Sequence, residues 1–174
     1  MNEEFEPHFR ALSAAAFEKL SVQPELRTVD PQYRCLSPSD LGFHNALRRP
    51  DGLLVFVDFE YFGWDDPVKL VCDFILHPGM NISAVDRQQF WNGTQEIFAN
   101  DPTFVERFEL CLPFYALRWC MILLNEFLPE RWQRRKAAGT LDELDERKAQ
   151  QFLKARAWLI KSKAVQEWKP GSVT

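Results

Sequence analysis

The sequence has few of the features that mark nucleic-acid-binding, secreted or metal-cluster proteins. Its 21 lysine and arginine residues face 25 aspartate and glutamate residues, a net charge of -4, so no excess of positive charge is present to bind a phosphate backbone. The four cysteines form no Cys-x-x-Cys pair, which favours buried thiols over a zinc site or a disulfide framework. The first ten residues are acidic and polar, which predicts no signal peptide. We therefore expect a cytoplasmic protein with no nucleic-acid partner.

Long apolar runs are also scarce. The most apolar stretch, residues 110–124, contains Arg118 and is shorter than the roughly 20 residues that a membrane-spanning helix needs. It therefore predicts a buried helix and no membrane partner. With 174 residues, 46% of them hydrophobic, the chain is long enough for one well-buried core, and we expect a single domain over residues 1–174.

The residues that suggest chemistry gather in one stretch. Asp40 and Asn45 lie in a segment rich in helix breakers, and Asp58 ends the apolar run 53–57, which is typical of a strand. The Asp51-Gly52 pair before that run is a strong hairpin signal, and a hairpin would bring Asp58 back beside Asn45. A carboxylate and a carboxamide side by side offer the oxygen ligands that Mg²⁺ prefers.

This order resembles the catalytic segment of protein kinases, which has an Asp, four residues, an Asn, a short hairpin and a metal-binding Asp. Here the order is Asp40, Asn45, hairpin and Asp58-Phe59-Glu60, followed by Gly63-Trp64-Asp65-Asp66-Pro67. With this continuation the chain is similar to the aminoglycoside phosphotransferase and choline kinase family, the small-molecule kinases with a protein-kinase-like fold. The resemblance covers residues 35–74 by motif and the helical remainder by architecture.

The resemblance implies ATP-dependent phosphorylation of a hydroxyl on a small molecule such as an aminoglycoside, choline or a sugar. Asp40 would be the catalytic residue that orients the hydroxyl and accepts its proton. Asn45 and Asp58 would hold Mg²⁺ on the phosphates of ATP, and Glu60 would assist the metal or orient a donor. Such a site gives no role to His44, which we expect, like the other two histidines, to be structural.

Two further acids are candidate site residues. Asp66 stands before Pro67 and is typical of a helix N-cap, and with Asp65 it would favour a cationic or polyhydroxylated acceptor. On the helix that follows, Asp73 either reaches back to hold the backbone of the catalytic loop, as the resemblance implies, or is an exposed helical acid.

The chain also departs from the family pattern. The family usually has a histidine two residues before the catalytic Asp, where this sequence has Pro38. The family also has an ATP-binding lobe before the motif, whereas about 35 residues precede it here. The alternative is therefore a truncated or inactive phosphotransferase lobe that acts as an interaction protein, or one that needs a separate N-terminal ATP lobe.

The rest of the sequence indicates a helical scaffold, so the expected fold is α+β and mostly helical, the C-terminal lobe of a protein-kinase-like fold. The small sheet should be limited to residues 33–58, with residues 60–66 as a loop. A basic cluster at Arg131, Arg134, Arg135 and Lys136 either meets a phosphate or is solvated. Helices are predicted at residues 4–20, from Pro67 to about 76, at 83–99, from 101 through the apolar run 110–124, and from a capping box at 140–143.

Overall fold

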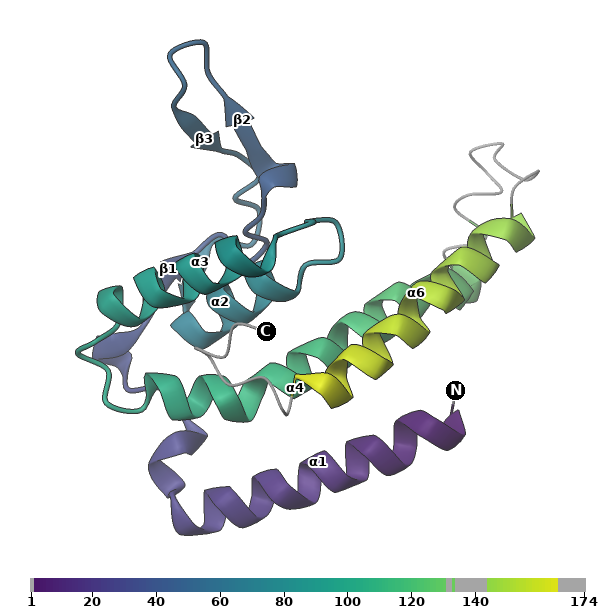
Figure 1. Ribbon diagram of the computed structural model, residues 1–174, viewed down its shortest axis with the longest axis horizontal. Helices are drawn as coiled ribbons and strands as arrows, with labels where there is room; N and C mark the ends of the chain where they lie inside the picture. Colours follow the sequence, from purple (N-terminus) through teal and green to yellow (C-terminus); the bar gives the residue numbers. More distant parts are fainter. Residues whose placement is uncertain (1, 131–132, 134–143, 166–174) are drawn as a thin grey trace.

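The computed structural model describes residues 2–130, 133 and 144–165, and it is mostly helical with two small antiparallel sheets (Figure 1). Within these residues every strand pairing is antiparallel, so the predicted mostly helical α+β class is confirmed. Short 3-10 helices at Pro24–Arg27, Pro31–Tyr33, Phe43–Asn45 and Leu124–Phe127 connect the larger elements. The α-helices are α1 (Asn2–Val22), α2 (Pro67–Leu76), α3 (Ala84–Ile97), α4 (Phe104–Leu123) and α6 (Leu144–Ala164).

The helix starts that the sequence indicates are confirmed at α2 and α3. Asp66 is the N-cap of α2, and its carboxylate accepts a hydrogen bond from the Val68 backbone nitrogen. Ser83 is the N-cap of α3, and its hydroxyl accepts from the Asp86 backbone nitrogen. Each side chain satisfies a donor that the first helical turn leaves without a partner.

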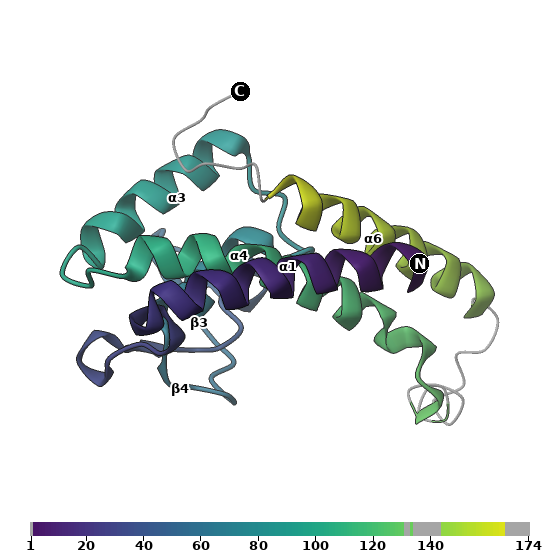
Figure 2. The same ribbon diagram turned by 90° about the horizontal axis from the view of Figure 1, so that it is seen from below.

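The core lies where α4 packs between α2 and α6. Helix α1 runs along α4 in both views (Figure 2), with the Phe9 ring edge-on to Phe114 at 6.4 Å. His8 contacts the Ser162 hydroxyl at 2.8 Å, which supports the structural role expected for this histidine. The buried cluster contains Leu12, Val68, Val71, Cys72, Ile75, Leu76, Trp91, Phe104, Phe108, Leu112, Ala116, Leu117, Cys120, Ala155, Trp158 and Leu159.

The predicted hairpin is present, but the sheet region extends further than expected. Strands β2 (Ala46–Arg48) and β3 (Leu54–Phe56) pair antiparallel and project away from the helices (Figure 1). Gly52 supplies the turn with φ +86°, a conformation that favours glycine.

The expected loop at residues 60–66 is wrong in part, and so is the limit of the sheet at residue 58. Residues Gly63–Asp65 form strand β4, which pairs with β1 (Cys35–Ser37). The three residues of β4 carry no apolar alternation, and their partner strand is distant in the chain. The pairing therefore leaves no local signal in the sequence.

The helix predicted from residue 101 through the apolar run is present as α4, although it begins at Phe104 with Thr103 as its N-cap. By length and composition alone, the segment Phe104–Phe127, with a mean hydropathy of 1.2, could cross a membrane, whereas residues 110–124 are too short. The core helix of a folded domain meets the same criterion, and this helix carries the buried Arg107. The basic residues Arg131, Arg134, Arg135 and Lys136 and the capping box at 140–143 lie outside the described residues.

Candidate functional site

The loop that carries Asp40 begins where β1 ends. The buried Ser37 accepts a hydrogen bond through its hydroxyl from the Ser39 backbone nitrogen at 3.1 Å. Ser39 has φ +67°, an uncommon conformation for a residue other than glycine. Such a conformation costs free energy and persists only where surrounding contacts hold it. Asp40 follows directly and is exposed. The loop thus presents an acid to solvent from a constrained backbone.

Lys69 of α2 holds this backbone in place. Its ammonium group donates to the Ser39 carbonyl at 3.2 Å and to the Ser39 hydroxyl at 2.9 Å. The same group lies 3.1 Å from a carboxylate oxygen of Asp73 and 3.5 Å from one of Asp65. Sequence reasoning missed Lys69, although its spacing of four residues from each acid on or next to one helix was a visible signal.

Asp73 is buried, with 4% of its surface exposed, so the alternative of an exposed helical acid is wrong. It accepts a hydrogen bond from Arg118 at 2.8 Å, and its other carboxylate oxygen lies 3.1 Å from the Lys69 ammonium group, which contacts the loop at Ser39. Burial raises the pKa of Asp73, while Arg118 and Lys69 act in the opposite direction. Asp73 therefore anchors the cation that holds the loop.

Asp40 and Asn45 lie together, as the motif predicts. The Asn45 side-chain nitrogen donates to the Asp40 carbonyl at 3.0 Å and lies 3.5 Å from an Asp40 carboxylate oxygen. Because the amide nitrogen is used in this contact, the amide oxygen is the atom that can serve as a metal ligand.

The hairpin brings residue 58 back to Asn45. The Val57 backbone nitrogen donates to the Asn45 carbonyl at 2.8 Å, and Asp58 follows with φ +64°. Asp58 is exposed and Asn45 is half-buried, so water and phosphate oxygens can complete a coordination shell there. The donor set suits Mg²⁺, which takes few protein oxygens and keeps several waters. If Asn45 and Asp58 bind one ion, we expect their side-chain oxygens to lie within about 6 Å of each other.

Glu60 and Asp66 lie in different settings. Glu60 is exposed in the turn between β3 and β4. Asp66 instead points toward the protein interior, where Arg107 donates to both of its carboxylate oxygens at 3.1 and 3.2 Å. Lys69 lies beside Asp65, so cations of the chain already offset both acids of this pair. Asp65 and Asp66 are therefore less suited to attracting a cationic acceptor.

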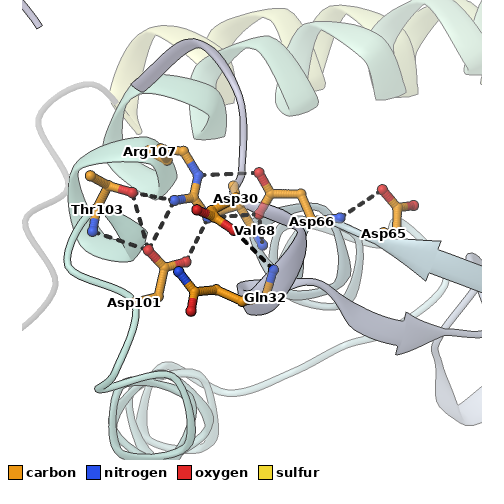
Figure 3. A network of polar contacts seen from close by, with 8 residues as sticks. All are labelled: Asp30, Gln32, Asp65, Asp66, Val68, Asp101, Thr103 and Arg107. Carbon is orange, nitrogen blue, oxygen red and sulfur yellow. Dashed lines mark hydrogen bonds and ion pairs between the residues drawn. The ribbon is translucent and has the colours of Figure 1, made fainter. Parts of the chain in front are cut away.

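Figure 3 shows the polar network in which Asp66 and Asp101 converge on Arg107. Arg107 is 2% exposed and donates to Asp101 at 2.8 and 3.1 Å, and it also contacts the Thr103 hydroxyl. Burial opposes ionisation of Asp101, but hydrogen bonds from Arg107 and Thr103 outweigh burial and lower its pKa. Sequence reasoning missed this network, because nothing local indicates that Arg107 is buried.

Two histidines that the sequence analysis assigned to structural roles lie beside Asp40. The His44 Nε2 atom is 3.3 Å and the His77 Nε2 atom 3.9 Å from the same Asp40 carboxylate oxygen. The imidazole rings stack with centroids 4.3 Å apart, and His77 packs edge-on against Trp119 at 4.9 Å. The predicted catalytic acid, Asp40, therefore has two stacked imidazole rings beside its carboxylate.

The three side chains could also hold a metal ion, since one ligand atom from each lies within 4.8 Å of the others. However, the Gly79 backbone nitrogen donates to His77 Nδ1 at 3.1 Å, which assigns the proton of a neutral ring to Nε2. A protonated Nε2 cannot bind a metal. The cluster is therefore better suited to contacting a carboxylate than to coordinating an ion.

No family model, no curated protein and no solved structure matches the chain.

Proposed function

We propose that this protein transfers the terminal phosphoryl group of ATP to a hydroxyl of a small molecule. The observation that carries the proposal is the hydrogen bond between Asn45 and Asp40, together with the hairpin contact between Val57 and Asn45 that precedes Asp58. This is the order of groups that phosphoryl transfer requires, an acceptor-orienting acid followed by two oxygen ligands for magnesium.

In this proposal Asp40 orients the acceptor hydroxyl and takes its proton. The acceptor oxygen bonds to the terminal phosphorus as the bond from that phosphorus to ADP breaks. Asn45 and Asp58 would hold Mg²⁺, which neutralises charge on the phosphates when bound. Positioning and charge stabilisation supply most of the rate in such reactions. Lys69 contributes indirectly, since it fixes the backbone of Ser39 just before Asp40.

The test is ATP turnover against a panel of aminoglycosides, choline and sugars. We expect a slow rate, because no residue in the proposal covers the phosphates or places a cation on them, and a single cation of that kind is worth roughly 10³ to 10⁵ in rate in related enzymes. Asp40→Asn should lower even the slow rate by about 100-fold or more, since it removes the general base.

The matched control for this variant is Asp51→Asn at the exposed tip of the hairpin, which removes the same charge outside the site and should leave the rate unchanged. A rate that Asp40→Asn does not alter would contradict the assignment of Asp40. No turnover with any acceptor in the panel would count against the kinase activity of this chain.

A second candidate function is supported by the surface of the hairpin. Both faces of β2 and β3 are exposed, and their apolar side chains include Leu47 (60%), Leu54 (51%) and Val55 (41%). A two-stranded hairpin is at best marginally stable alone, and contiguous apolar surface marks interaction sites. The chain would then act through a protein partner, such as a separate ATP lobe, that covers the hairpin. Leu47→Ser with Val55→Ser should abolish such an association in a pull-down without lowering the melting temperature.

A further inference from the structure

The orientation of the Asp40 carboxylate matters for the proposed reaction. Asp40 is an exposed side chain on a loop. A free carboxylate would sample several rotamers, whereas general-base catalysis needs one geometry. The nearest ring nitrogens belong to His44 and His77, at 3.3 and 3.9 Å from one Asp40 oxygen.

His44 is held in place by a close approach to Gly42. A Cβ added at Gly42 would lie 2.5 Å from both Cε1 and Nδ1 of His44, and 3.1 Å from the Met80 sulfur. Gly42 is buried and has an extended backbone, with φ -175°, which any residue can adopt. The space that its missing side chain leaves is therefore what admits the imidazole ring.

His77 is held from the other side. It is the C-cap residue of α2, its Nδ1 accepts from the Gly79 backbone nitrogen, and its ring packs edge-on against Trp119. Burial lowers the pKa of His77, and His44 lowers it further, while Asp40 and Asp73 act in the opposite direction. Because Nδ1 accepts the hydrogen bond from Gly79, the proton of a neutral His77 is on Nε2, the nitrogen that lies 3.9 Å from an Asp40 carboxylate oxygen.

We propose that His44, stacked on His77 and admitted by the space at Gly42, is the residue that positions the Asp40 carboxylate. The pair acts from the downstream side of the loop that carries Asp40. This inference rests on the proposed function for its kinetic consequence, but its structural part concerns the chain alone. His44 and His77 are positioning residues, since they act through Asp40.

The kinetic test compares His44→Ala and Gly42→Ala with the control Gly63→Ala. The Gly42 variant displaces the His44 ring without removing it, whereas a Cβ at Gly63 would have nothing within 4 Å. We expect both test variants to lower kcat by about 10- to 100-fold, as misplacement of a catalytic group by about 1 Å does, with KM for ATP unchanged. The Gly63 variant should match the wild-type chain. An unchanged kcat in His44→Ala would overturn the proposal.

A second pair of variants separates positioning from support of the fold. His77→Asn retains an acceptor for the Gly79 backbone nitrogen but places no donor near Asp40, whereas His77→Gln places an amide nitrogen near the position of Nε2. We expect the Gln variant to retain more of kcat than the Asn variant. The reverse order would show that His77 acts only through the turn at Gly79.

A readout independent of turnover is the side-chain rotamer of Asp40, measured by NMR through the three-bond couplings about χ1. One rotamer is expected in the wild-type chain, and averaged couplings in His44→Ala and Gly42→Ala. Couplings already averaged in the wild-type chain would overturn the positioning role. A single Asp40 rotamer in a chain that shows no turnover would contradict only the proposed function. Zinc binding that His77→Ala abolishes would overturn the tautomer assigned to His77, and the proposal with it.

Discussion

Arg107 illustrates at the scale of one residue how the helices of this protein are held together. Its guanidinium group is almost fully buried, yet it is fully engaged, with Asp66 on one side and Asp101 and Thr103 on the other. The network ties the start of α2 to the start of α4. Because a buried charge left without its partner is costly, these contacts hold the starts of the two helices together.

Arg107→Met should therefore lower the free energy of unfolding by about 3–5 kcal/mol, because it leaves the carboxylates of Asp66 and Asp101 without their cationic partner. Urea denaturation measures the change. Arg10→Met is the matched control, because Arg10 pairs with Glu6 on the exposed face of α1 and such pairs contribute at most about 1 kcal/mol. Equal effects of the two substitutions would contradict the network as a source of stability.

Asp101 gives the network a pH dependence. Its pKa is lowered below 3.8, so the unfolded chain binds the proton more tightly, and stability rises with pH between the folded and unfolded values. The contribution of Asp101 is complete above about pH 4 and is lost as the pH falls through the folded pKa. The free-energy difference between wild type and Asp101→Asn should be large at pH 7 and shrink below pH 3.8. A difference that stays constant from pH 7 to pH 2.5 would contradict the lowered pKa.

At the scale of the elements, α2 connects the core to the candidate site. Its buried face joins the core cluster, and from the same helix Lys69 reaches the strained Ser39. A sequence can indicate the start and end of such a helix, because Asp66, Pro67 and Pro78 act locally. It could not indicate that Lys69 contacts a loop 30 residues earlier, since that contact depends on how β1 and β4 pair.

Lys69→Met should release the loop. We expect it to lower the free energy of unfolding by about 1.5–3 kcal/mol, the range for hydrogen bonds to charged groups, and to lower ATP turnover as well, because Ser39 precedes Asp40. Lys154→Met on the exposed face of α6 is the control and should change neither quantity. Loss of stability with full turnover would show that Lys69 supports the fold but not the site.

For the whole molecule, the sequence predicts the parts that depend on neighbours in the chain. The Asp40–Asn45 contact, the hairpin turn at Gly52 and the helix caps all follow from local spacing. The histidine pair, the Arg107 network and the β1–β4 sheet join segments distant in sequence, and their residues carry no local mark of burial. The candidate acids could therefore be identified from the motif, whereas the side chains that hold and orient them required the structure.

The exposed hairpin is the feature of the whole molecule that bears most on the phosphoryl-transfer proposal. Asp58 follows its second strand, β3, by two residues, and the apolar side chains of β2 and β3 are exposed. A partner that covers the hairpin would also restrict Asp58, so partner binding and metal binding would be coupled. The two proposed functions would then depend on the same surface.

The most direct test of the account is where a metal–nucleotide complex binds. Mn²⁺ with a non-hydrolysable ATP analogue should broaden the NMR signals of the Asn45 side-chain amide and the Asp58 backbone amide more strongly than those of other residues, because the metal would lie beside both. Asp58→Ala should abolish this broadening, and Asp51→Asn should preserve it. Broadening centred elsewhere, or unaffected by Asp58→Ala, would contradict a phosphoryl-transfer site built on Asp40, Asn45 and Asp58.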